Sequence, residues 1–62
     1  MNRLKELREK AGLSYEELAV KLGVSVRYIR FIETGDRTPS LRIALKISKL
    51  LNKDVNDIFL LS

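Results

Sequence analysis

Apolar residues recur along this chain at intervals of three and four positions, the spacing that gathers side chains on one face of an α-helix. Residue types that end or begin helices separate the apolar stretches. A glycine suits the left-handed position after a helix, and a serine can cap the free N–H groups of the next one. The glycines are Gly12, Gly23 and Gly35, and the serines are Ser14, Ser25 and Ser40. The pattern predicts five helices, at residues 3–10, 15–22, 26–34, 41–51 and 55–60.

Each predicted helix has an apolar face that can line a shared core. The helix at 26–34 would turn Ile29 and Ile32 inward. The inward positions of the other four helices are Leu4, Leu7 and Ala11; Leu18, Ala19 and Leu22; Leu41, Ala44, Leu45, Ser48 and Leu51; and Val55, Ile58 and Phe59. Because 62 residues suffice for one modest core, we expect a compact all-α five-helix bundle that forms a single domain over residues 1–62.

The link between the second and third predicted helices is only three residues long. Gly23 allows a tight turn, Val24 is expected to fill the gap between the helices, and Ser25 caps the second helix. A short glycine-containing link is typical of a helix-turn-helix, but it also joins the helices of an ordinary α-helical hairpin. The spacing by itself leaves both interpretations open.

The outer face of the helix at 26–34 favours DNA binding. With the two isoleucines inward, a rotation of about 100° per residue leaves an outer face opposite them. This face carries Arg27, Arg30, Phe31 and Thr34, with Val26 at its exposed start. Arginine binds O6 and N7 of guanine through two hydrogen bonds, and an apolar side chain can contact the methyl group of thymine. We therefore assign base contacts to Val26, Arg27, Arg30 and Phe31. The alternative is that the arginines are simply solvated and that Phe31 packs on a neighbouring tyrosine.

The distribution of charge adds to this picture. The formal net charge is +4, and the basic residues are concentrated in the middle of the chain. Residues 24–53 hold seven basic and two acidic side chains, whereas residues 1–23 hold nearly equal numbers of each. A basic surface suits a polyanion such as double-stranded DNA.

The composition argues against catalysis and against bound metals or cofactors. The chain has no cysteine and no histidine, which removes disulfides, the usual zinc ligands and the common proton shuttle. No glycine-rich phosphate loop is present. We expect no enzyme activity, no catalytic residue, no cofactor and no metal. The chain also has no bilayer-spanning apolar run and no apolar signal-peptide stretch, so we expect a cytoplasmic protein with no membrane partner.

Two stretches of the sequence together resemble a known family. They read Leu13-Ser14-x-x-Glu17-Leu18-Ala19-x-x-Leu22-Gly23-Val24-Ser25 and Ile29-x-x-Ile32-Glu33-x-Gly35-x-Arg37-x-Pro39-Ser40-Leu41. This combination is similar to the phage-repressor and Cro-like helix-turn-helix regulators, also called the XRE family. The resemblance covers about residues 3–59. It implies a lambda-repressor-like DNA-binding domain that places the helix at 26–34 in the major groove.

The resemblance implies roles for further residues. Contacts to DNA phosphates are implied for Ser14, Tyr15, Ser25, Tyr28, Thr34, Gly35, Arg37 and Arg42. Tyr15 stands where relatives often have glutamine, and its hydroxyl would donate one hydrogen bond to a phosphate. Asp36 stands where relatives often have a basic residue, which would weaken backbone affinity there. Arg8 and Glu33 match a structural, largely buried ion pair of relatives, so Glu33 need not oppose DNA.

The C-terminal sequence predicts an interface between two copies. Ile58, Phe59, Leu60 and Leu61 are consecutive apolar residues, more than one short helix can bury, and contiguous exposed apolar surface usually marks a contact. We assign residues 55–62 to a two-fold symmetric homodimer, which would suit a palindromic operator and a role as a repressor. A tighter local core or a frayed terminus would account for the same residues.

A different class of function is also open. The chain could be an antitoxin-like or adaptor module of the same fold that binds a protein partner instead of DNA. Such a module should carry a contiguous apolar patch on the outer face of the helix at 26–34, where this sequence has Arg27 and Arg30. The sequence therefore favours the DNA-binding interpretation.

Overall fold

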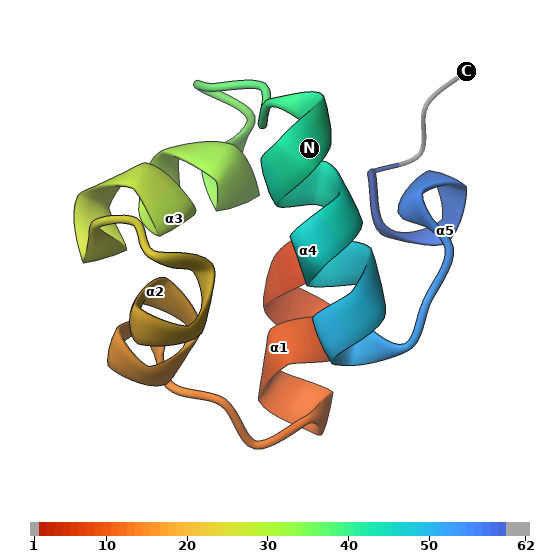
Figure 1. Cartoon of the computed structure of the whole chain (residues 1–62), viewed down its shortest axis with the longest axis horizontal. Coiled ribbons are helices and arrows are strands. Elements are labelled where there is room, and N and C mark those ends of the chain that lie inside the picture. The colour runs from red at the N-terminus through yellow and green to blue at the C-terminus, as the bar shows by residue number, and fades with distance from the viewer. Residues whose placement is uncertain (1, 60–62) are drawn as a thin grey trace.

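The computed structural model describes residues 2–59, in which five helices and no β-strand occur (Figure 1). The helices are α1 Leu4–Lys10, α2 Tyr15–Leu22, α3 Val26–Thr34, α4 Leu41–Leu51 and α5 Val55–Phe59. The all-α prediction is confirmed, and residue 60, the expected end of the last helix, lies outside the described residues. Ala11, which was expected to point inward, follows the end of α1 and is exposed. Over residues 2–59 no helix is both long and apolar enough to cross a membrane.

Serine caps begin three of the helices. The hydroxyls of Ser14, Ser25 and Ser40 each accept a hydrogen bond from the backbone N–H three residues later, at 3.1 to 3.2 Å. Ser14 also takes part in a capping box, because its own N–H donates to the Glu17 carboxylate at 2.9 Å. These bonds satisfy N–H groups that have no partner within the helix, and so they fix where α2, α3 and α4 begin.

The core is built from one apolar face of each helix. Its six fully buried large side chains are Leu4, Leu18, Ile29, Ile32, Ile47 and Ile58. All five helices contribute to this set, so they share one core instead of forming two. In Figure 1, α2 and α3 lie on one side of the molecule and α5 on the other, with α1 and α4 between them.

The start of the chain is fastened to two distant helices. The side-chain amide of Asn2 donates to the carbonyl of Ile32 at 2.7 Å, and the backbone N–H of Arg3 donates to the carbonyl of Ile58 at 2.7 Å. These two bonds hold the beginning of α1 against the ends of α3 and α5. The end of α3 is therefore tied directly to the start of the chain.

The buried face of α4 differs from the predicted one. Leu41 and Leu45 were expected in the core, but they are 73% and 51% exposed, while Ala44 and Ile47 are buried. Two apolar stripes overlap on this helix, one through Leu41 and Leu45 and one through Ala44, Ile47 and Leu51. The helical period of the sequence does not show which of the two stripes is buried. Packing against α2 and α5 selects the second stripe and leaves the first facing outward.

The capping box of α2 predicts a contribution to stability that depends on pH. The backbone N–H and the hydroxyl of Ser14 lower the pKa of the Glu17 carboxyl below its ordinary value of 4.5. The unfolded chain, where this bond is absent, therefore binds the proton more readily than the folded chain. The stabilising effect is present above the ordinary pKa and is lost as the pH falls through the lower pKa of the folded state.

We expect Glu17→Gln to reduce the loss of stability on acidification, because glutamine can still accept the bond from Ser14 but does not titrate. The measurement is urea unfolding from neutral pH to well below the pKa of a free carboxyl. Glu16→Gln, which removes a charge from the same exposed turn, is the matched control and should keep the pH dependence of the native chain. Equal pH dependence in all three proteins would contradict the assignment.

Candidate nucleic-acid interface

The turn between α2 and α3 is tight because of its backbone conformation. Gly23 has a φ of 72°, in the left-handed region, and a Cβ added there would meet no atom within 4 Å. Conformation, not space, is therefore what requires glycine at this position. The N–H of Val24 donates to the carbonyl of Ala19 at 3.0 Å, and the Val24 side chain packs half-buried against the core. The two helices consequently pack against each other across a three-residue link.

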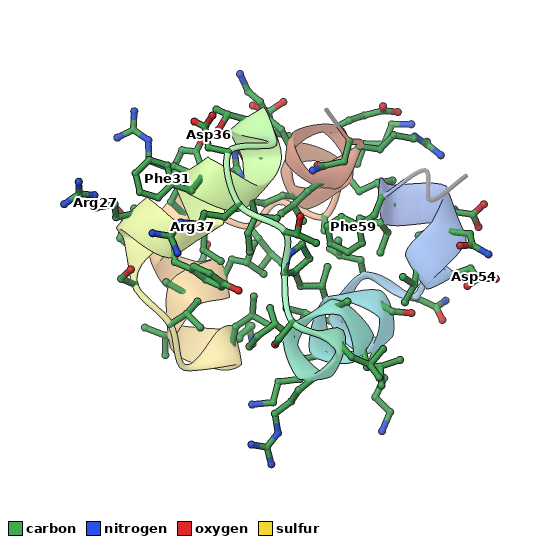
Figure 2. All side chains as sticks on the ribbon, turned by 90° about the horizontal axis from the view of Figure 1, so that it is seen from above. Arg27, Phe31, Asp36, Arg37, Asp54 and Phe59 are labelled. Carbon is green, nitrogen blue, oxygen red and sulfur yellow. The ribbon has the colours of Figure 1, made fainter. Side chains whose placement is uncertain are left out.

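α3 has one face in the core and one in solvent, as its sequence predicts. Ile29 and Ile32 have no exposed surface. On the opposite side Arg27 and Arg30 are exposed, and Phe31 is half-buried. Figure 2 shows Arg27 and Phe31 at the outer edge of the molecule, on the side opposite Phe59. The residues that line this outer hollow are Val26, Arg27, Arg30, Phe31, Thr34 and Asp36.

Some of the expected phosphate-binding residues lie beside this face. Ser25, Tyr28 and Arg37 line a second hollow together with Arg27 and Phe31. Arg37 reaches this position because its backbone N–H donates to the carbonyl of Phe31 at 3.1 Å, which folds the loop after α3 back onto the helix. The exposed Ser14 stands at the start of α2. Arg42 does not join this group: it lies on α4, beside the exposed leucines.

At Thr34 and Gly35 the expected donors are already used within the protein. The Thr34 hydroxyl is within donating distance of the Phe31 carbonyl, at 3.1 Å, and of the Asp36 carboxylate, at 2.9 Å. The N–H of Gly35 donates to the carbonyl of Ile32 at 3.2 Å and closes the end of α3. These internal bonds cap the end of α3, and the phosphate contacts implied for the backbone here stay a prediction.

The expected ion pair lies between α1 and α3. The Nε of Arg8 donates to Oε2 of Glu33 at 2.8 Å, and the two side chains are only 7% and 5% exposed. The Nη1 of Arg8 donates to the carbonyl of Leu13 at 2.8 Å. Burial works to lower the pKa of Arg8, but the hydrogen bond and the charge of Glu33 outweigh it, so the pKa is raised and the side chain stays charged. The acidic residue of α3 is thereby neutralised inside the protein.

Tyr15 belongs to this buried pair and not to the expected phosphate contacts. Its hydroxyl donates to Oε1 of Glu33 at 2.9 Å, so the one proton it could give to a phosphate is engaged. The guanidinium of Arg8 lies over the tyrosine ring, 4.0 Å from its centroid. The two oxygens of the Glu33 carboxylate therefore each have a separate donor, one from α1 and one from α2. The resemblance suggested the position of Tyr15, but the partner of its hydroxyl depends on the packing of three helices.

Each arginine of the outer face also lies over an aromatic ring. The guanidinium carbon of Arg27 is 5.4 Å from the centroid of Phe31, and that of Arg30 is 5.8 Å from the centroid of Tyr15. Both distances fall within the range of cation–π attraction. The spacing of four residues between Arg27 and Phe31 could have predicted the first contact. The second joins different helices and has no sequence signal.

Comparisons with known proteins agree with this geometry. Residues 4–58 match the helix-turn-helix family model HTH_3. The chain is 45% identical over 58 residues to an uncharacterized HTH-type transcriptional regulator of Archaeoglobus fulgidus, covering 94% of this chain and 83% of the relative. The crystal structure of the restriction-modification controller protein C.AhdI from Aeromonas hydrophila superposes with a TM-score of 0.78 at 38% identity, covering 89% of this chain and 83% of that one. The N-terminal DNA binding domain of SinR from Bacillus subtilis gives 0.76 at 36% identity, covering 87% and 80%.

Removing one member of the buried ion pair should destabilise the fold strongly. We expect Glu33→Ala to lower the free energy of unfolding by about 3–5 kcal/mol, because it leaves the Arg8 charge buried without its partner. Arg3→Ala, which breaks the exposed pair of Arg3 with Glu6 at 3.2 Å, should have a much smaller effect, because water screens this pair. Denaturant unfolding of the native chain and of both variants would measure these changes in the free energy of unfolding.

The double variant Arg8→Met/Glu33→Leu controls for a simple loss of packing. It removes both charges, so it should recover part of the stability lost in Glu33→Ala. Equal effects of Glu33→Ala and Arg3→Ala would show that the buried pair is no more important than a surface pair.

Proposed function

The chain belongs to the XRE-type helix-turn-helix family of DNA-binding transcriptional regulators, and we propose that it reads a short DNA sequence by placing α3 in the major groove. One observation carries this proposal. Arg27 and Arg30 are exposed on the face of α3 that lies opposite its two buried isoleucines. A face so placed can enter a groove without any change in the packing of the core.

The side chains on this face have the chemistry of base recognition. Arg27 and Arg30 each carry a planar guanidinium that can donate two hydrogen bonds to O6 and N7 of guanine. Val26 and Phe31 are half-buried and offer apolar contact to thymine methyl groups. No carboxylate of α3 opposes this, since Glu33 is turned inward onto Arg8. Asp36, at the rim of the hollow, is the one acidic neighbour among the residues that line it.

Phosphate contacts would hold α3 in register. Ser25, Tyr28 and Arg37 flank the proposed base-reading residues on one side, and the exposed Ser14 at the start of α2 has a hydroxyl proton that it can donate to a further phosphate. Such contacts carry little sequence information, but they supply much of the affinity and its dependence on salt. Repression is the simplest consequence, because a protein bound at an operator excludes other proteins from the same DNA.

The two kinds of contact predict different effects of mutation. Arg27→Ala and Arg30→Ala should each weaken specific binding by about 1–3 kcal/mol and relax the preference at one base pair. Arg37→Ala should weaken binding to all duplexes alike and reduce the salt slope by roughly one unit. Lys5→Ala, on the exposed face of α1, is the charge-matched control and should leave sequence preference unchanged.

Selection of bound duplexes from a randomised pool at physiological salt measures these preferences. An enriched palindrome with half-sites about ten base pairs apart supports a dimeric operator-binding protein. If no sequence is enriched, or if Arg27→Ala and Arg37→Ala cause the same uniform loss, the base-reading role is wrong. The protein-binding module of the same fold then becomes the better proposal.

A palindromic site requires two copies, and we place their contact on α4 and α5. Ile58, expected at this interface, is fully buried in the core and unavailable, whereas Leu60 and Leu61 lie outside the described residues. Leu41 and Leu45 offer an exposed apolar stripe, and a largely apolar hollow reaches from Leu41 to the half-buried Phe59. Phe59 lies on the side away from Arg27 (Figure 2), so a second copy bound there leaves the outer face of α3 free. Arg37 also lines this hollow, so the contact would lie next to one of the proposed phosphate-binding residues.

We expect Leu41→Lys and Leu45→Lys to shift the protein toward monomers, because an apolar stripe that faces its own copy across a two-fold axis would then carry repelling charges. Val20→Lys is the matched control, since Val20 is 81% exposed on α2, away from this surface. Sedimentation equilibrium of the three variants measures the association. Monomers in the native protein at all concentrations, or dimers in all variants, would refute the contact.

A further inference from the structure

We propose that Tyr15 is a positioning residue that orders Arg30 for base recognition. The inference rests on the proposed function of Arg30 and adds a second residue to it. Arg30 is exposed on α3, and its guanidinium carbon lies 5.8 Å from the centroid of the Tyr15 ring, which comes from the start of α2. The ring thus gives this exposed arginine a contact from a second helix.

The Tyr15 ring is itself held firmly by the interior. Its hydroxyl donates to Oε1 of Glu33 at 2.9 Å, and Arg8 lies over the ring at 4.0 Å. Arg8 in turn is fixed by Glu33, at 2.8 Å, and by the carbonyl of Leu13, at 2.8 Å. A continuous series of contacts therefore leads from the buried ion pair to the outer face of α3. An exposed tyrosine without these bonds would be a much less rigid support.

Ordering matters because a free arginine side chain loses many rotamers when it binds a base with two hydrogen bonds. A ring beneath the guanidinium already restricts the side chain in the free protein, so less conformational entropy is lost when Arg30 binds DNA. It also keeps the planar group in a limited set of orientations, while leaving its N–H donors available. The benefit applies only to the correct base, since only there are both hydrogen bonds made.

Arg27 provides an internal comparison. Its guanidinium lies over Phe31, 5.4 Å from the ring centroid, and Phe31 is four residues later on the same helix. The two arginines are therefore supported from different elements, one by α3 itself and one by α2. A substitution at Tyr15 should act on Arg30 and spare Arg27, and a substitution at Phe31 should do the reverse.

The test compares Tyr15→Leu with Tyr15→Phe. Both variants lose the hydrogen bond to Glu33, so they share its cost in stability, but only Tyr15→Phe keeps the ring. In the free protein, we expect nitrogen relaxation of the Arg30 Nε–H group to report greater motion in Tyr15→Leu and nearly native order in Tyr15→Phe. The Nε–H of Arg27 should be unchanged in both.

Binding to DNA gives the second readout. Tyr15→Leu should reduce discrimination roughly three- to tenfold at the base pair whose preference Arg30→Ala abolishes, and at no other. Tyr15→Phe should keep most of that discrimination. Phe31→Leu should affect the base pair of Arg27 and the base that Phe31 itself contacts, and should spare the base pair of Arg30. In a double variant, Tyr15→Leu should add little to the effect of Arg30→Ala, because each substitution already removes the contact between the Tyr15 ring and the Arg30 guanidinium.

The outcomes separate this inference from the proposed function. Unchanged order of Arg30 in Tyr15→Leu would overturn the positioning role, whatever the DNA data show. A uniform loss at every base pair, or equal losses in Tyr15→Leu and Tyr15→Phe, would also overturn it and leave Tyr15 as part of the fold only. If Arg30→Ala itself alters no base preference, the proposed function of Arg30 fails, and a positioning role in recognition fails with it.

Discussion

The ion pair between Arg8 and Glu33 is the interaction on which the placement of α3 depends. Two opposite charges are almost entirely removed from water, so each must find partners inside the protein. Arg8 bonds Glu33 and the carbonyl of Leu13, and Glu33 also accepts from Tyr15. Over residues 2–59, every buried side-chain polar atom has a hydrogen-bond partner. Because this arrangement joins α1, α2 and α3 through directional bonds, it holds the three helices more specifically than apolar packing alone would.

The same pair decides what the outer face of α3 presents. A helix of nine residues has room for a core face and a functional face, but Glu33 would be unfavourable on a surface that meets phosphates. Turning it inward, next to Ile29 and Ile32, leaves Arg27 and Arg30 as the charged groups of α3 that face outward. The core and the exposed arginines thus occupy opposite sides of one short helix, and Tyr15, which contacts both Glu33 and Arg30, lies between the buried carboxylate and the outer face.

The helix caps, the N-terminal residues and α4 hold α2 and α3 in their places around the core. Serine caps and the left-handed Gly23 fix the relative direction of α2 and α3, while the bonds of Asn2 and Arg3 attach the N-terminus to α3 and α5. α4 completes the core with Ala44 and Ile47 and keeps an apolar stripe on its outer side. A small domain buries a limited apolar area, so association with a second copy through that stripe would also add to its stability.

The sequence alone determined the five helices, the tight turn and the two faces of α3, because caps, glycines and helical period are local signals that neighbours in the chain suffice to express. It also determined the placement of Arg27 and Arg30 opposite the isoleucines. It did not determine the buried face of α4, where two apolar stripes of equal period compete and only contact with α2 and α5 selects one. Nor did it determine the partner of the Tyr15 hydroxyl, or which of two predicted places Ile58 takes, the core or the contact with a second copy. Those outcomes depend on residues far apart in the chain, such as Tyr15 with Glu33 and Arg3 with Ile58, whose approach is fixed only when all the helices pack together.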